Sequence, residues 1–363
     1  MKELFLLDPD VVFLNHGSYG ATPRPVFEAY QRYQLELERN PVEFLGRRFP
    51  DLIDAARLRL AAYVGADPDG LVFVPNATAG INVVARSLPL RPGDEVLASD
   101  REYGAVNIVW RFVCEGAGAR YVQHPPEELW DAVTERTRVL SISHVSSPTA
   151  EILPVEELCR RARAAGTLTV VDGAHAPGQL PLELDALGAD AYSGNCHKWL
   201  CAPKGAGFLW AGPTFRDLLE PLIVSWDWER ETEFATRHRW QGTRDPAACL
   251  AVPDAIDFLA EHHWDEVRAR CHELAARAQA GISEWAATEP RSGPFAQMAA
   301  AQLPPCDPAE IQRQLRERYA IEVPCKAWEG RPLIRVSLQG YNEETDVERL
   351  LAALLELDAF EPQ

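Results

Sequence analysis

The sequence lacks several features that would assign it to common functional classes. No apolar run approaches the length of a membrane span, and the eight cysteines contain no Cys-x-x-Cys pair, so neither a membrane span nor a metal site is indicated. Basic residues are few: 36 Lys and Arg stand against 54 Asp and Glu, a net charge of −18, which argues against nucleic acid or an anionic membrane as a partner. Residues 1–8 become acidic too soon for a secretory signal. We therefore expect a cytoplasmic protein with reduced cysteines.

The chain is long enough for two domains. It has 363 residues, and from about residue 70 to 210 short β-rich runs alternate with helical runs. Such alternation is typical of a mostly parallel sheet covered by helices. The pattern changes near residue 249. We predict a large domain at residues 15–248, a small α+β domain at 249–363, and an N-terminal segment, residues 1–14, that packs with the small domain.

The positions of several elements follow from hydrophobic spacing and turn residues. Strands are predicted at residues 71–74, 93–98, 138–143, 168–171, 321–323 and 333–338. Helices are predicted around residues 108–113 with a stop at Gly116, at 154–166, at 307–319 and at 347–355. A further helix, ending near residue 285, is expected to connect the two domains.

A lysine in the middle of the chain has neighbours that suit a cofactor site. Lys198 follows the polar or small residues 193–197 just past a strand, and residues 202–207 can turn tightly and let backbone approach a ligand. A lysine amine can form an imine with an aldehyde cofactor and then move protons at a substrate's α-carbon. A lone lysine after a turn is more often a surface residue, and it is the neighbouring residues that favour a cofactor site here.

An aspartate upstream of that lysine ends another apolar strand. Asp172 closes the run 168–171 and is followed by a turn that contains His175. A carboxylate beside a pyridine nitrogen keeps the ring protonated, which makes pyridoxal phosphate (PLP) an electron sink, and a histidine nearby can donate to the cofactor's phenolic oxygen. The alternatives are a helix N-cap for Asp172 and a loop histidine for His175. Together with Lys198, these residues predict a PLP enzyme.

Three further positions suit the same cofactor and an amino-acid substrate. Residues 76–80 form a small polar turn between a strand and a helix, where backbone N–H groups and the Thr78 hydroxyl can bind phosphate. Tyr103 can stack on the cofactor ring, or lie in the core or on the surface. Arg335 alternates with the apolar face of its strand, so its guanidinium can clamp a carboxylate by two hydrogen bonds. A solvated strand arginine is the alternative.

Several motifs resemble one branch of a known enzyme family. They lie at residues 13–23, 39–45, 241–246, 321–324 and 335–342. With the lysine segment, they are similar over nearly the whole chain to the class V aminotransferase-like PLP enzymes of fold type I, and in particular to the isopenicillin N epimerase-like branch. The resemblance implies an α/β protein of PLP fold type I, with a mostly parallel sheet in the large domain and a smaller α+β C-terminal domain.

The resemblance implies roles around the cofactor ring. Lys198 would be the Schiff-base lysine and Asp172 the partner of the pyridinium nitrogen. His175 and Ser147 would lie near the phenolic oxygen, and Tyr103 would occupy the ring-stacking position.

It also implies a phosphate site, a dimer and substrate contacts. The phosphate would be held by Ala77, Thr78, Asn195 and His197 and, from a neighbouring subunit, by Gly242 and Thr243. Because residues of one subunit would complete the phosphate site of the other, the resemblance implies a homodimer with its active site at the subunit interface. Arg335 would bind the substrate's α-carboxylate with Asn15 near it, and either Arg47 or Arg48 would reach the substrate.

Two departures point away from the cysteine desulfurases of this class. Those enzymes carry a nucleophilic cysteine on a flexible loop well before the carboxylate arginine, whereas Cys325 ends a β-like run ten residues before Arg335. We expect Cys325 to be a buried small hydrophobe. Tyr103 also stands where the desulfurases have a histidine.

Several reactions fit the predicted residues. Epimerase or racemase action on an amino acid needs Lys198 to remove the α-proton and a second donor, which the sequence does not identify. A PLP-dependent C–S lyase acts by β-elimination on a cysteine-derived substrate. It needs proton transfer on one face of the substrate only, so it fits the predicted residues equally well. Transamination and desulfuration are less favoured, and a non-enzymatic PLP-fold regulator would not need to keep Lys198.

Overall fold

The computed structural model describes residues 1–228 and 233–357, which form two compact units. Unit 1 consists of Met1–Arg24, Pro148–Ile152 and Leu259–Gln363, and unit 2 of Pro25–Ser147 and Leu153–Phe258. The chain therefore passes between the units more than once. The domain boundaries expected from the sequence, after residues 14 and 248, stay a prediction.

Unit 2 is built on a seven-stranded sheet with the spatial order β2-β8-β7-β6-β5-β3-β4. From β7 to β4 all neighbouring strands are parallel, and β8 runs antiparallel to both β2 and β7. The strands are β2 (Leu71–Val74), β3 (Glu95–Ser99), β4 (Arg120–His124), β5 (Thr137–Ser143), β6 (Leu168–Gly173), β7 (Ala191–Asn195) and β8 (Gly207–Ala211). The predicted α/β class with a mostly parallel sheet is confirmed.

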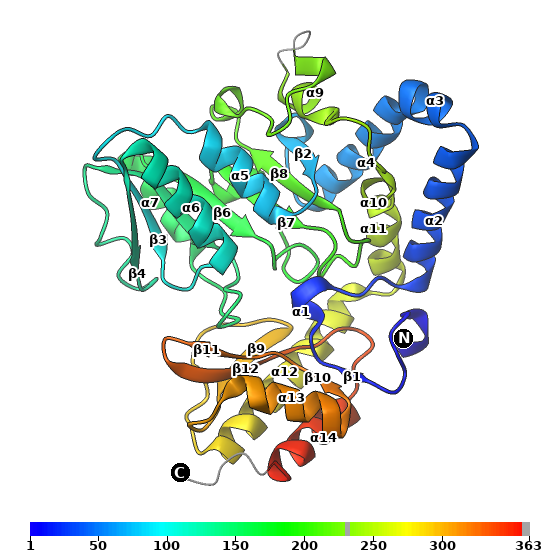
Figure 1. The fold of residues 1–363 in the computed structure, drawn as a ribbon, viewed down its shortest axis with the longest axis vertical. Helices are drawn as coiled ribbons and strands as arrows, with labels where there is room; N and C mark the ends of the chain where they lie inside the picture. Colours follow the sequence, from blue (N-terminus) through cyan, green and yellow to red (C-terminus); the bar gives the residue numbers. More distant parts are fainter. Residues whose placement is uncertain (229–232, 358–363) are drawn as a thin grey trace. The chain divides into compact units, whose positions relative to one another are not determined.

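Helices cover this sheet, and Figure 1 shows α5 and α6 side by side across it. The α-helices are α2 (Arg24–Arg39), α3 (Pro41–Glu43), α4 (Phe49–Tyr63), α5 (Ala77–Ser87), α6 (Gly104–Ala117), α7 (Val155–Ala165), α8 (Leu184–Leu187), α9 (Phe234–Arg239), α10 (Ala247–Leu250) and α11 (Val252–Glu261). Shorter turns are η2 (Phe44–Arg48, a π-helix), η3 (Pro68–Gly70), η4 (Arg216–Leu218) and η5 (Trp226–Trp228). The core between the sheet and the helices is apolar. Trp110 of α6 is buried in it, and its indole N–H donates to Ser141 Oγ at 2.8 Å.

Local chemistry explains where the helices begin and end. The Asn76 side chain caps α5 by accepting from Ala79 N at 3.0 Å. Gly118 ends α6 with φ at +67°, a left-handed conformation that suits glycine. The predicted stop at Gly116 is therefore wrong by two residues, because Gly116 continues the helix.

Unit 1 contains two small sheets and its own helices. The parallel pair is β1 (Val12–Phe13) with β10 (Ile321–Glu322), and the antiparallel sheet has the order β11 (Cys325–Trp328), β12 (Arg331–Ser337), β9 (Met298–Gln302). The helices are η1 (Lys2–Leu4), α1 (His16–Tyr19), α12 (Trp264–Ala286), α13 (Pro308–Tyr319) and α14 (Glu344–Leu355). The predicted smaller α+β part is confirmed.

The single helix expected to end near residue 285 is two helices. His263 adopts φ +50° between α11 and α12, and a left-handed residue cannot continue the hydrogen-bond ladder of an α-helix. The hydrophobic spacing on either side of it resembles one helix, which is why the sequence pattern missed the break.

Candidate functional site

The residues predicted to bind the cofactor ring gather where parallel strands of unit 2 end. β6 ends at Gly173 and β7 at Asn195, and the register pairs Asp172 with Ser193. Lys198 follows β7 by three residues. Ligands of open α/β sheets bind beyond the carboxyl ends of the strands, so the predicted chemistry lies at the edge where a ligand is expected.

Lys198 faces a histidine whose proton can be assigned. Its Nζ lies 3.1 Å from Nε2 of His175, and the indole N–H of Trp199 donates to Nδ1 of His175 at 3.2 Å. Because an indole nitrogen can only donate, Nδ1 is the acceptor and the neutral ring carries its proton on Nε2. That N–H faces Nζ of Lys198, the amine that must lose its extra proton before it can attack a carbonyl carbon.

Asp172 is a buried carboxyl that suits a cationic partner. It is 4% exposed, and its Oδ1 accepts from Ala174 N at 2.9 Å. Burial raises the pKa of Asp172, although the Ala174 hydrogen bond and the charge of Lys198 act in the opposite direction. A buried carboxylate is costly unless a positive charge lies against it. A protonated ring nitrogen of a planar cofactor would supply that charge.

The turn before α5 offers hydrogen-bond donors for an anion. The N–H of Ala77 donates to Oδ1 of Asn195 at 2.8 Å, which ties the start of α5 to the end of β7. Within residues 1–228 and 233–357, neither the N–H nor the hydroxyl of Thr78 makes a hydrogen bond. Two such donors at the N-terminus of an 11-residue helix fit a phosphate group.

His197 lies beside this turn and is neutral in the cofactor-free chain. Its Nδ1 faces the carbonyl oxygen of Ala206 at 3.1 Å, so the proton lies on Nδ1 and Nε2 is an acceptor. Burial lowers the pKa of His197 to about 4; the Ala206 hydrogen bond opposes this and the charges of Lys198 and Lys204 add to it. An anion against Nε2 would favour the protonated ring, so phosphate binding is expected to take up a proton here.

Gly207 of β8 allows the close packing behind the phosphate turn. A Cβ built at Gly207 would lie 2.8 Å from Asn76 Cα and 2.9 Å from the carbonyl oxygen of Gly194, so backbone would have to move. We expect Gly207→Ala to weaken PLP binding by about tenfold or more, because overpacking displaces the turn that presents Thr78. Gly212→Ala is the matched control, since its new Cβ meets nothing nearer than 3.6 Å. Equal cofactor affinity of the two variants in a fluorescence titration would contradict this expectation.

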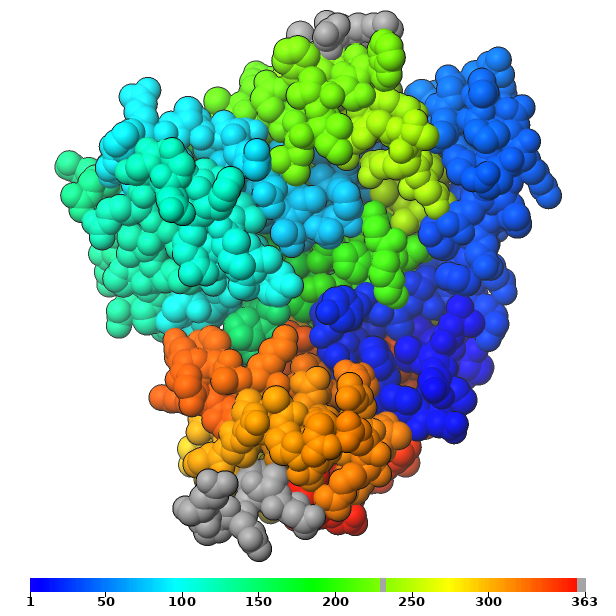
Figure 2. All heavy atoms as spheres, in the orientation of Figure 1, coloured from blue at the N-terminus to red at the C-terminus, as the bar shows by residue number. Residues whose placement is uncertain are grey.

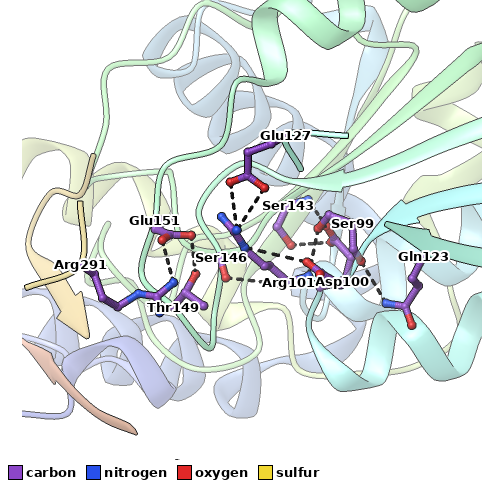
Figure 3. A network of polar contacts seen from close by, with 11 residues as sticks. Ser99, Asp100, Arg101, Gln123, Glu127, Ser143, Ser146, Thr149, Glu151 and Arg291 are labelled. Atoms are coloured by element: carbon purple, nitrogen blue, oxygen red, sulfur yellow. Dashed lines mark hydrogen bonds and ion pairs between the residues drawn. The ribbon is translucent and has the colours of Figure 1, made fainter. Parts of the chain in front are cut away.

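One buried carboxyl of this region, Glu102, was not predicted from the sequence. It is 4% exposed and accepts from Ser143 N at 2.9 Å, from Ser143 Oγ at 2.6 Å and from Ser99 Oγ. Figure 3 shows both serines directed toward the same network. Burial raises the pKa of Glu102 to about 7, the hydrogen bonds oppose this, and the charge of Asp172 adds to it. The next residue, Tyr103, is the N-cap of α6 and is 47% exposed.

The residues predicted to bind a carboxylate lie in unit 1 and are joined by hydrogen bonds. Nη2 of Arg335 donates to Ser18 Oγ at 3.3 Å, and Ser18 donates to Asn15 Oδ1 at 2.6 Å. Asn15 Nδ2 in turn donates to Glu322 Oε1 at 3.2 Å. Ser18 and Glu322 were missed by the sequence analysis, although both lie inside the motifs that carry the family resemblance.

The remaining predicted residues lie on exposed or partly buried parts of unit 2. Gly242 has φ +89° and an added Cβ there would meet nothing within 4 Å, while the Thr243 side chain is exposed. Arg47 and Arg48 belong to the exposed π-helical turn η2, where Arg47 pairs with Glu43 and Arg48 pairs with Glu36 at 3.0 Å. Ser147 is partly buried four residues after β5.

The donor set of unit 2 fits PLP. It contains a lysine amine for an aldehyde, a buried carboxyl for a ring nitrogen and open donors at a helix start for a phosphate. In the part of the chain that the structure describes, no group of three or more His, Cys, Asp and Glu side chains could hold a metal ion. No helix among these residues is long and apolar enough to span a bilayer.

Comparison with known proteins agrees with this fit. The aminotransferase class-V family model matches residues 12–350. The chain is 41% identical to the isopenicillin N epimerase of Amycolatopsis lactamdurans, covering 98% of this chain and 97% of the relative, and 40% identical to that of Streptomyces clavuligerus, covering 96% and 95%. The structure of the cystine C–S lyase C-DES in complex with cysteine persulfide superposes with a TM-score of 0.85 at 22% identity, covering 96% and 98%, which shows a shared fold.

The fold and the site define a PLP-dependent enzyme of fold type I. The chain belongs to the class V aminotransferase family, and the resemblance read from its motifs is confirmed.

Proposed function

We propose that this enzyme is an epimerase or racemase that acts at the α-carbon of an amino-acid substrate, as an isopenicillin N epimerase does. The observation that carries the proposal is the amine of Lys198, held 3.1 Å from a histidine whose own proton is fixed by Trp199. The two epimerases that are 40–41% identical over nearly the full length support the same reaction.

In this proposal each residue around the cofactor ring has a separate role. Bound PLP withdraws electrons from the substrate's α-carbon. Lys198 removes the α-proton from one face, and Asp172 keeps the ring nitrogen protonated while the charge develops. His175 contacts the phenolic oxygen with Ser147 near it, and Tyr103 stacks on the ring.

The phosphate and the substrate carboxylate have their own sites. Ala77, Thr78, Asn195 and His197 are proposed to hold the phosphate. Arg335 binds the α-carboxylate, its guanidinium oriented by the Ser18 hydroxyl at 3.3 Å, and Asn15 supports Ser18. Arg47 or Arg48 of η2 is proposed to reach the rest of the substrate.

A C–S lyase acting by β-elimination is the second candidate. One observation favours it: a base is identified on one face only, at Lys198, and β-elimination needs no second proton donor. Desulfuration is disfavoured because Cys325 is 4% exposed and burial holds the pKa of its thiol far above the usual value. A persulfide-forming cysteine must reach its thiolate form and its substrate. Transamination is less favoured as well.

One experiment separates these reactions. The enzyme is incubated with panels of amino acids in heavy water, and the products are analysed by mass spectrometry and chiral chromatography. Solvent deuterium at the α-carbon with both enantiomers recovered supports epimerisation. Pyruvate with sulfide or a sulfenate supports the lyase and overturns the first proposal, as does conversion of the cofactor to its amine form, which supports transamination.

We also propose a homodimer in which Gly242 and Thr243 complete the phosphate site of the neighbouring subunit. A run of apolar side chains is exposed on unit 2, in the green part of the chain at the surface in Figure 2. Its members are Leu218, Leu222, Ile223, Val224, Trp226 and Trp228. Contiguous apolar patches of this kind mark interaction sites. Sedimentation equilibrium should give twice the 40.4 kDa of one chain, and a monomer at active concentrations would contradict the dimer.

A cytoplasmic location is proposed as well. All eight cysteines are free thiols in the described structure, as suits a reducing compartment. Fractionation of the native host would test it.

A further inference from the structure

Two buried carboxyls of unit 2, Glu102 and Asp172, are connected through one serine. Ser143 donates to Glu102 with both its N–H and its hydroxyl, at 2.9 and 2.6 Å. The same Ser143 is paired with Asp172 in the register of β5 and β6. The charge of Asp172 disfavours the ionised form of Glu102, because like charges repel in a buried region.

Glu102 also fixes the start of α6. Ser99 donates to its carboxyl from the end of β3 and Ser143 from the end of β5, so two neighbouring strands anchor the residue that precedes Tyr103. The N-terminal end of α6 is thereby tied to the carboxyl ends of the sheet, where Asp172 lies.

The hydrogen-bond partners of Glu102 accept either protonation state. A serine hydroxyl donates to a carboxylate or accepts from a carboxylic acid, so Ser99 and Ser143 satisfy both forms. With its pKa at about 7, Glu102 changes charge in the neutral range. The other groups that face it are Asp172 on β6 and Tyr121 on β4, whose pKa is raised by burial first and by Glu102 second.

We propose that Glu102 is a positioning residue that holds Tyr103 at the cofactor ring and, by its charge, sets how firmly Asp172 keeps the ring nitrogen protonated. This rests on the proposed function of Asp172 and Tyr103. Ionised Glu102 adds a second negative charge near the ring nitrogen, which favours the protonated ring. Protonated Glu102 withdraws that support, so the electron-withdrawing power of the bound cofactor changes with pH.

The test compares three purified holoenzymes. The wild type is expected to show a change in the visible spectrum of the bound cofactor and in kcat with a midpoint near pH 7. Glu102→Gln keeps the hydrogen-bonding shape without the charge, so it should bind PLP with wild-type affinity and lose this titration. Glu102→Ala removes the anchor of Tyr103 and should bind PLP at least about tenfold more weakly, which corresponds to the loss of a buried hydrogen-bonding group.

Thermal unfolding gives a readout that does not depend on turnover. Because the folded pKa of Glu102 lies above the usual 4.5, ionisation of this group costs stability as the pH rises from about 4.5 to about 7. The unfolding midpoint of Glu102→Gln minus that of the wild type should therefore increase as the pH rises through that window. Above it, the difference should stay constant.

The control is a second buried carboxyl, Glu95, at the opposite end of β3 from the turn that carries Glu102. Glu95 starts β3 and accepts from Thr137 Oγ1 at 3.2 Å, so Glu95→Gln should leave the spectral titration in place. If Glu102→Gln is insoluble, Ser143→Ala serves instead: it removes a donor to the carboxylate and should move the midpoint to higher pH. An unchanged titration in Glu102→Gln, or in Ser143→Ala, overturns the proposal. A wild type that binds no PLP overturns the proposed function instead.

Discussion

Replacing Lys198 by alanine is expected to abolish the visible absorbance of the purified enzyme and to lower turnover by at least about 10²–10⁴-fold, the range for loss of a positioned general base. Nζ of Lys198 lies 3.1 Å from Nε2 of His175, and alanine removes the amine that would attack the aldehyde. The measurement is an absorbance spectrum of protein reconstituted with PLP, followed by steady-state kinetics. Retention of a visible band in Lys198→Ala would contradict the assignment.

The small number of lysines in the chain allows a specific control for this result. The chain has four lysines: Lys2, Lys198, Lys204 and Lys326. Lys204→Arg should keep the visible band, although its charge contributes to the low pKa of His197. Reduction with borohydride followed by peptide mass spectrometry should locate the cofactor mass on the peptide that contains Lys198, and a modified peptide from another lysine would refute the site.

Replacing Asp172 by asparagine is expected to lower kcat/KM by about 10²–10³-fold while the protein still folds, the range for loss of one electrostatic contact to the reacting group. Asparagine keeps the size and the hydrogen bond from Ala174, at 2.9 Å in the wild type, but cannot balance a protonated ring nitrogen. Steady-state kinetics on the substrate identified in the heavy-water assay measure the loss. Asp190→Asn is the control, because Asp190 accepts from Thr169 N at 2.7 Å before the start of β7, at the opposite end of the sheet.

Stability separates a catalytic role of Asp172 from a structural one. Its folded pKa is raised above 3.8, so the ionised carboxylate costs stability in the cofactor-free protein at neutral pH, and asparagine removes that cost. The cofactor-free Asp172→Asn protein should therefore unfold at a temperature no lower than wild type. Marked destabilisation of that form would show that Asp172 serves the fold.

The sequence located the strands of unit 2 and the chemistry at their ends because both follow from short-range patterns. Residues 71–74 are β2 as predicted, and the ends of β6 and β7 bring Asp172 and Lys198 to one edge because parallel strands share a direction. Hydrophobic runs and turn residues are visible along the chain without knowledge of the strand order.

What the sequence could not show depends on contacts between distant residues. Glu102 stands in a charged run after β3, which suggests a solvated turn, and only the pairing of β3 with β5 surrounds it with Ser99 and Ser143. The tautomer of His175 likewise depends on the rotamer of Trp199, which carries no signal in the spacing of the two residues.

The construction of unit 1 from separate stretches of chain has a consequence for its biosynthesis. β1 finds its partner β10 some 300 residues later in the chain, and Glu151 is bonded to Arg291 at 2.8 Å (Figure 3). β1 therefore cannot pair until the ribosome has synthesised the chain as far as β10. A chain truncated before residue 321 would leave β1 without its partner strand, so unit 1 should acquire its stability only after β10 has been synthesised.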